Sequence, residues 1–255
     1  MVGDSVILNA ATSHWMNRMS RTSYAPVLAA ALLSVGCLDV SGTINNSFPF
    51  DFSVPGSGIG EGWSVAAADV AVDRVTDVAV AGEYGGLPAP YTAFTGIQQA
   101  GTNVSGSLFL FHKKWIQSPW SPGRTFRASI DMSFVSNLHS GCTTGPGPVV
   151  VIKAGVSEEE PIATADGQGV LRFNLDKGTG AAGGDFVQLG DIRNGLENCP
   201  AQGTWQVRNT VQADQPEVLT IDPLGGFWIF FGTESTFSGR HDIYFIRFRV
   251  TLVAE

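Results

Sequence analysis

The sequence predicts an all-β protein, a jelly-roll-like β-sandwich of two sheets with about 11 to 12 strands. From position 48 onward, apolar and polar residues alternate with a period of two in most segments, as in strands with one buried face. Charged residues make up only 15% of the chain, which contains 31 Gly and 13 Pro, a composition typical of short strands joined by turns. Segments do not recur at a fixed period, which argues against a propeller.

A segment that directs export is expected before the sandwich. Arg18 and Arg21 precede a short apolar run at 27–35, and Cys37 follows two residues later. The run is much shorter than the roughly 20 residues of a membrane-spanning helix. This order is typical of a bacterial secretory signal that ends at a lipidated cysteine, although Ser34 stands where such signals most often have Leu. The alternative is ordinary signal cleavage nearby, which would leave Cys37 without lipid.

The predicted organisation is a leader at 1–36, a polar tether at 37–47 and a single β-sandwich domain at 48–255. The start of the leader fits neither a signal nor a fold, so Met16 or Met19 is an alternative start. We expect an exported lipoprotein of the bacterial cell envelope, in the periplasm or at the cell surface, that contacts the membrane only through its lipid. The formal net charge of −8 argues against nucleic acid as a partner.

Three cysteines, Cys37, Cys142 and Cys199, are present. If Cys37 carries lipid, the other two form one even pair in an oxidising compartment, which predicts a disulfide. The alternative is two buried free thiols. A zinc site is disfavoured because neither cysteine has a Cys-x-x-Cys partner.

The strands expected in chain order are 48–54, 63–70, 75–83, 91–98, 107–113, 125–135, 149–154, 170–177, 185–189, 204–211, 226–233 and 241–253. The segment 107–113 is apolar on both faces until His112, which predicts a central position, and 226–233 is also hydrophobic on both faces. In 125–135 one face is predicted to be buried, formed by Phe126, Ala128, Ile130, Met132 and Phe134.

The last strand, 241–253, is expected in the interior of its sheet because both of its faces carry large side chains. One face is predicted to carry Tyr244, Ile246, Phe248, Val250 and Leu252. The other is predicted to carry His241, Arg247, Arg249 and Thr251.

No cofactor is predicted. Gly178, Gly180 and Gly183 satisfy the dinucleotide-binding pattern, but no helical periodicity follows them. The sequence contains neither G-x-S-x-G nor H-E-x-x-H, and nothing selects a particular carboxylate pair for glycoside hydrolysis. Calcium is an alternative at 166–169 or near Asp185 and Asp191, although these spacings do not match an EF-hand loop.

Charged residues that close otherwise apolar strands are costly to bury unless they are paired. Five such residues stand next to Gly-containing loops and are predicted to gather at one rim of the sandwich: Lys153, Asp176, Lys177, Asp191 and Glu234. This rim would be a ligand site on loops carried by a rigid scaffold. The alternative is a set of internal ion pairs that hold loops to strands.

Four stretches resemble a group of uncharacterised secreted bacterial β-sandwich proteins (hypothetical lipoproteins). They are SNLHSGC, GPGPVVVIKAGVSEEEP, NLDKGTGAAGGDFVQLGDIRN and FWIFFGTESTFSGRHDIYFIRF. Those relatives tend to show an acidic pair after an Asn-x-Ser, whereas here Asn103, Val104 and Ser105 precede Gly106 and Ser107. The resemblance covers roughly 48–253 and implies fold and export, but no established activity.

Three classes of function remain. The leading one is a binding module for a glycan or another envelope component. The second is a structural or assembly lipoprotein without a small ligand, and the third is a polysaccharide hydrolase. Tryptophan or tyrosine side chains exposed on one sheet face would favour the first, and two carboxylates facing each other across a cleft would favour the third.

Overall fold

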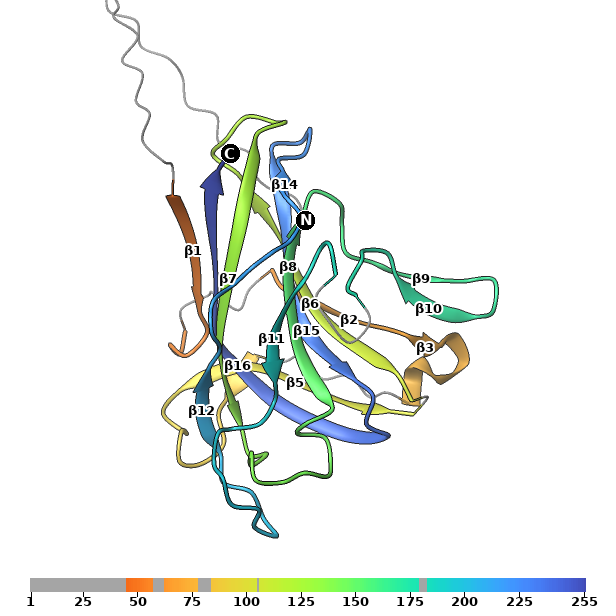
Figure 1. Ribbon diagram of the computed structural model, residues 1–255, viewed down its shortest axis with the longest axis vertical. Helices are drawn as coiled ribbons and strands as arrows, with labels where there is room; N and C mark the ends of the chain where they lie inside the picture. Colours follow the sequence, from red (N-terminus) through yellow and green to blue (C-terminus); the bar gives the residue numbers. More distant parts are fainter. Residues whose placement is uncertain (1–44, 57–61, 78–83, 105, 179–182) are drawn as a thin grey trace, which may run out of the picture. The chain divides into compact units, whose positions relative to one another are not determined.

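The computed structural model describes residues 45–56, 62–77, 84–104, 106–178 and 183–255, which lie within the compact unit Gly42–Glu255. The prediction of an all-β sandwich is confirmed, because two antiparallel sheets face each other around one core (Figure 1). The leader at 1–36, Cys37 and most of the tether lie outside the described residues.

The first sheet, sheet A, has the order β12-β7-β16-β5-β4, with β1 on β16 and with β13 and β14 on β7. Its strands are β1 (Asn45–Asp51), β4 (Tyr84–Gly86), β5 (Thr95–Asn103), β7 (Thr125–Ser136), β12 (Gln206–Asn209), β13 (Ala213–Asp214), β14 (Leu219–Thr220) and β16 (Gly239–Ala254). β7 runs beside the second part of β16, from Tyr244 to Ala254, whereas the first part of β16 curves away from β7 and pairs with β5 (Figure 1).

The second sheet, sheet B, has the order β11-β8-β15-β6-β2. Its strands are β2 (Ser64–Ala68), β6 (Leu108–Gln117), β8 (Val150–Ser157), β11 (Val187–Asp191) and β15 (Gly226–Ser235). A small third sheet, sheet C, contains β3 (Val70–Ala71), β9 (Ala163–Ala165) and β10 (Val170–Phe173), and a 3-10 helix, η1 (Val72–Asp77), follows β3.

The core lies between sheets A and B, and alternation in β7 shows how it forms. Phe126, Ala128, Ile130, Met132 and Phe134 are all buried, as predicted. They pack against the inner side chains of β8, β15 and β16 in one continuous cluster. Burying each large apolar side chain contributes about 1.5–3 kcal/mol, so this face sets the register of the strand.

A second apolar cluster covers the outer face of sheet B. Phe109, Phe111 and Phe230 point away from the main core and pack against Leu175 and Phe186, which belong to the segment after sheet C. This layer explains why β6 and β15 are apolar on both faces. The central position predicted for 107–113 is confirmed, since β6 lies between β15 and β2, and β15 likewise lies between β8 and β6.

The interior position predicted for the last strand is confirmed, but the predicted division of its faces is wrong. A β-bulge between Phe245 and Arg247 inserts one extra residue and shifts the alternation. His241, which was placed with the arginines, is therefore buried, and Tyr244 and Ile246 are separated from the buried Phe248. They lie on the face of sheet A that points away from sheet B.

Some expected strand bounds also change. The first part of the predicted strand 75–83 is the 3-10 helix η1, and 78–83 lies outside the described residues. The predicted strand 170–177 ends at Phe173, and the first strand already begins at Asn45, inside the predicted tether. The position at which a strand ends depends on which backbone groups find hydrogen-bond partners, and the pattern of residue types does not show this.

Candidate functional site

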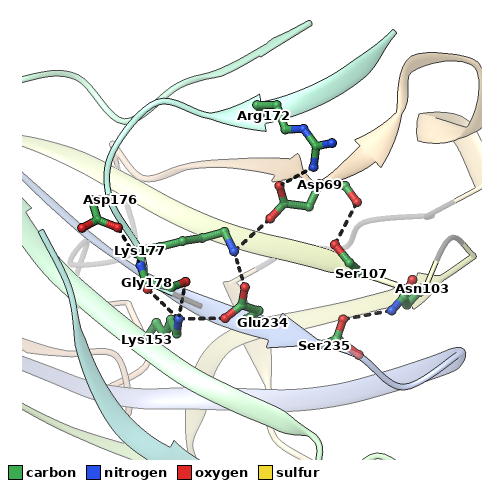
Figure 2. Close-up of polar contacts among 10 residues, drawn as sticks. All are labelled: Asp69, Asn103, Ser107, Lys153, Arg172, Asp176, Lys177, Gly178, Glu234 and Ser235. Atoms are coloured by element: carbon green, nitrogen blue, oxygen red, sulfur yellow. Dashed lines mark hydrogen bonds and ion pairs between the residues drawn. The ribbon is translucent and has the colours of Figure 1, made fainter. Parts of the chain in front are cut away.

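Four of the five predicted rim residues come together on the outer face of sheet B, as Figure 2 shows. Lys153 lies on β8 and Glu234 on the neighbouring β15, and Lys153 Nζ is 2.8 Å from Glu234 Oε2. Lys177, which follows β10, forms an ion pair with the other carboxylate oxygen, Glu234 Oε1. Glu234 therefore bridges two lysines that are 24 residues apart in the chain.

Lys153 has no exposed surface, and its ammonium group also donates hydrogen bonds to two backbone carbonyls, Lys177 O at 2.6 Å and Gly178 O at 3.3 Å. Burial acts to raise the pKa of Glu234, but hydrogen bonds from Lys153 and Lys177 outweigh it and hold that pKa below its ordinary value. Burial likewise opposes the charge of Lys177, yet its bond to Glu234 and the charge of Asp69 raise its pKa.

Asp69 extends the network and was missed in the sequence analysis. Its carboxylate lies 3.0 Å from Lys177 Nζ and 3.5 Å from Arg172 Nη1 (Figure 2). Asp69 has a φ of 58°, a left-handed conformation that is uncommon outside glycine. Asp69 is the one charged residue in the apolar segment WSVAAADV, but it is not next to a Gly-containing loop, the feature that selected the other five residues.

Asp176 belongs to the same region but has a different role. Its carboxylate accepts hydrogen bonds from the backbone N–H groups of Gly178 and Gly184, both at 3.0 Å. These bonds lower the pKa of Asp176. Asp191 does not join the network: it pairs with Arg193, whose Nη2 lies 2.6 Å from Asp191 Oδ2.

The network joins sheet C and the segment after β10 to the outer face of sheet B. Its cations and carboxylates satisfy one another, so this geometry supports internal ion pairs, the structural alternative. A ligand role for these residues stays a prediction.

Two of the buried histidines, His139 and His241, form hydrogen bonds inside the domain, whereas Nε2 of the buried His112 has no hydrogen-bond partner among the described residues. His241 Nε2 lies 2.9 Å from Thr233 Oγ1, whose hydroxyl donates to Gln99 Oε1 at 2.7 Å. Burial lowers the pKa of His241 to about 4 and that of His112 to about 3. Thr204 N donates to His139 Nε2 at 2.9 Å, which holds two loops together.

Within the described residues no group of three or more His, Cys, Asp or Glu could hold a metal ion. At 166–169, the Asp166 carboxylate accepts backbone hydrogen bonds from Gln168 at 2.8 Å and Val170 at 2.9 Å, and pairs with Arg172. The sequence DGQG thus forms a turn.

The predicted disulfide is confirmed. Cys142 and Cys199 are bonded, with their Cα atoms 4.9 Å apart. The bridge ties the loop that follows β7 to the loop that precedes β12. Asn137 and Leu138 stand at the start of the first loop, and Trp205 stands at the end of the second.

Trp205 and Tyr244 form an aromatic pair on the outer face of sheet A. Their ring centroids are 5.4 Å apart, at an interplanar angle of 79°. Tyr244 lies opposite Val135 of β7, which is completely buried, and Val207 of β12 lies opposite the same residue. On this face of β16, side chains of Arg247 and Arg249 are 44% and 43% exposed, so the face is open to solvent.

A hollow of about 230 Å³, called the polar hollow below, adjoins this pair. Its lining residues are Asn137, Leu138, Pro146, Trp205, Arg240, His241 and Asp242. Asp242 accepts hydrogen bonds from Gln98 Nε2 at 3.0 Å on both carboxylate oxygens, and Arg240 Nη2 lies 3.7 Å away. Burial raises the pKa of Asp242. Burial, together with the Asp242 charge, raises the pKa of Tyr244.

A second hollow of about 250 Å³, called the apolar hollow, lies on the other side of Tyr244. Its lining residues are Ser53, Leu87, Tyr91, Phe94, Val207 and Ile246. Phe94 is 50% exposed and Val207 is 41% exposed. Sequence alternation could not place this surface, because the bulge moves Ile246 to this face and Trp205 comes from a loop.

Among the described residues no helix is long and apolar enough to cross a membrane. No protein-family model matches the chain, and no curated protein matches it.

Several solved structures are similar to the chain. A carbohydrate-binding module of the β-sandwich superfamily is 13% identical, with a TM-score of 0.34, over 72% of this chain and 55% of that one. A cleaved adhesin domain of Lys-gingipain from Porphyromonas gingivalis is 12% identical, with a TM-score of 0.36, over 82% and 99%. A module in complex with β-1,4-galactotriose is 13% identical, with a TM-score of 0.31, over 74% and 88%. At these TM-scores the similarities carry no information on function.

Proposed function

We propose that this protein is a glycan-binding module of the bacterial cell envelope and that it binds its ligand on the outer face of sheet A. The observation that carries the proposal is the Trp205–Tyr244 pair beside the polar hollow. It places aromatic rings next to a carboxylate, a guanidinium and an amide on an open sheet face.

This set of side chains matches the chemistry of a sugar. A pyranose ring has an apolar C–H face that packs on an aromatic ring, and its rim of hydroxyls both donates and accepts hydrogen bonds. Asp242 accepts, Arg240 donates, and Asn137 does both. Small-molecule sites typically combine aromatic walls with a few such polar groups.

The surface is preorganised. Tyr244 is on the long interior strand β16, and the Gln98 amide holds the Asp242 carboxylate. The disulfide and the His139 contacts fasten the loops that carry Asn137 and Trp205. A site that is rigid before binding loses little conformational entropy when the ligand arrives.

Export and lipid anchoring at Cys37 complete the proposal. They are supported by the order of basic, apolar and small residues before Cys37. The Cys142–Cys199 bridge is also what an oxidising compartment allows.

The test is binding to a panel of envelope and plant polysaccharides, measured by affinity electrophoresis and calorimetry. Trp205→Ala and Asp242→Asn should each weaken binding at least tenfold without a matching loss in melting temperature. Trp115→Ala is the matched control, because Trp115 forms a similar aromatic pair with Trp228 on sheet B. Absence of binding to every glycan, or equal loss in the Trp115 and Trp205 variants, would contradict the proposal.

A polysaccharide hydrolase is the second candidate, and one observation favours it. A hollow of about 300 Å³ contains Glu158, Glu159, Asp185 and Glu217 among its lining residues. Burial, and secondarily the charges of Asp176 and Glu159, raise the pKa of Asp185, as in a general acid. Incubation with a glycan that the protein binds tests this activity. Reducing sugar that the parent protein releases and the Asp185→Asn variant does not would establish it.

A further inference from the structure

The two hollows beside the Trp205–Tyr244 pair differ in chemistry, although one strand joins them. Asp242 lines the polar hollow, Ile246 lines the apolar hollow, and Tyr244 lies between them on β16. At the rise of a β-strand, Asp242 and Ile246 are roughly 13 Å apart. Trp205 and Val207 repeat this arrangement two residues apart at β12. One ligand can therefore contact both hollows.

We propose that the ligand is a glycolipid, with its sugar on the Trp205–Tyr244 pair and an alkyl chain in the apolar hollow. This inference rests on the proposed function and specifies its ligand class. Five of the six residues that line the apolar hollow are aliphatic or aromatic, and Ser53 is the sixth. A sugar alone leaves such a surface exposed to water, whereas an alkyl chain covers it.

Two exposed apolar side chains share the apolar hollow. Phe94 is the one aromatic residue among the exposed large apolar side chains of the described ranges, and it is 50% exposed. Val207, in the same hollow, is 41% exposed. Single exposed apolar residues need no explanation, but two that share a hollow next to a sugar-type site indicate an apolar partner.

The hollow is preformed. The loop 87–94 closes on itself through hydrogen bonds from Leu87 N to Phe94 O at 3.0 Å and from Tyr91 N to Pro88 O at 2.9 Å. Gly96 allows Leu87 and Ile246, two lining residues, to approach β5 closely, because a Cβ there would lie 2.9 Å from Leu87 Cδ2 and 3.3 Å from Ile246 Cγ2. Glycine is needed for this close approach.

The test uses matched methyl and octyl glycosides of glucose, galactose and N-acetylglucosamine, below their micelle concentrations, with 1-octanol as a probe without sugar. For at least one sugar, the octyl glycoside should bind at least tenfold more tightly than the methyl glycoside in calorimetry. That ratio corresponds to about 1.4 kcal/mol. Octanol should bind more weakly than the octyl glycoside.

Variants separate the two parts of the ligand. Phe94→Ser and Val207→Ser should each remove the octyl advantage and leave methyl glycoside binding unchanged. Both side chains are substantially exposed, so melting temperatures should stay close to that of the parent protein. Trp205→Ala should weaken both glycosides. Val211→Ser is the control, because Val211 is 85% exposed and lies outside both hollows.

Two results would overturn the inference in different ways. Equal affinity for methyl and octyl glycosides would contradict the alkyl site but not the proposed glycan binding. Octanol binding as tight as that of the octyl glycoside and unaffected by Trp205→Ala, with no glycan bound, would support the alkyl site but contradict glycan binding and with it the proposed function.

Discussion

Lys153 Nζ lies 2.8 Å from Glu234 Oε2 on adjacent strands of sheet B, and the Lys153 side chain has no exposed surface. A buried cation without a counter-charge is strongly unfavourable. The Lys153–Glu234 pair therefore connects the ion network to the stability of the whole outer layer.

Glu234→Gln should destabilise the protein by roughly 3 kcal/mol in urea unfolding, because it removes the counter-charge of the buried Lys153. Glu255→Gln is the matched control. Glu255 pairs with Arg127 at 2.7 Å, but the Arg127 side chain is 75% exposed. Loss of this ion pair should therefore cost less than about 1 kcal/mol of stability. A Glu234→Gln variant that keeps its melting temperature but loses ligand binding would instead support the predicted ligand rim.

Stability should fall as the pH drops below 6.5. Burial lowers the pKa of His112 to about 3 and that of His241 to about 4, whereas both have ordinary values of 6.5 in the unfolded chain. Below pH 6.5 the unfolded state therefore binds protons that the folded state does not, until the folded pKa values are reached. The loss by pH 5 is about 2 kcal/mol for each histidine.

His112→Phe should reduce the fall in stability between pH 7 and pH 5 by about 2 kcal/mol. Of the two histidines with lowered pKa, His241 alone then binds a proton in the unfolded state that the folded state does not bind. Urea midpoints measured across that range check the expectation. The pKa of Glu234 is lowered from its ordinary value of 4.5, so Glu234 changes the pH dependence of stability below that value and not between pH 7 and pH 5. An unchanged pH dependence in His112→Phe would contradict the assignment.

Replacing both Cys142 and Cys199 by Ser should cost about 4 kcal/mol of stability, because the bridge closes a loop across 57 positions of the unfolded chain. It should also weaken glycan binding, since the bridge fastens the loops that carry Asn137 and Trp205. Non-reducing peptide mapping of exported protein should show the two cysteines joined. Two alkylatable thiols in that preparation would refute the bridge.

Cys37→Ala should leave the protein without lipid and change its membrane fractionation, because the thiol is the acylation site in the proposed export signal. Detergent-phase partitioning of the parent and variant measures the effect. If the Cys37→Ala protein still partitions into the detergent phase, the lipoprotein proposal is wrong.

The sequence by itself determined the fold class and the strands that occupy the core. Alternation in β7 and the apolar runs of β6 and β15 encode burial directly, since the side chains of a strand point to its two faces in turn. The disulfide also followed from the number of cysteines. Charged residues at strand ends pointed to Lys153, Lys177 and Glu234, which lie together in the ion network, but their role as a ligand rim stays a prediction. Asp69 joins the same network without standing next to a Gly-containing loop, so that criterion did not select it.

Only the tertiary structure decided where a ligand can bind. The bulge after Phe245 depends on backbone pairing between β16 and β7, and together with the pairing of β12 on β7 it places Tyr244 and Ile246 beside residues of β12 and its preceding loop. Trp205 and Tyr244 are 39 residues apart in the chain, and Phe94 is more than 100 residues from both. Such contacts arise from sheet order and loop closure, which depend on pairing across the whole chain. Local periodicity reports only which face of a strand is buried.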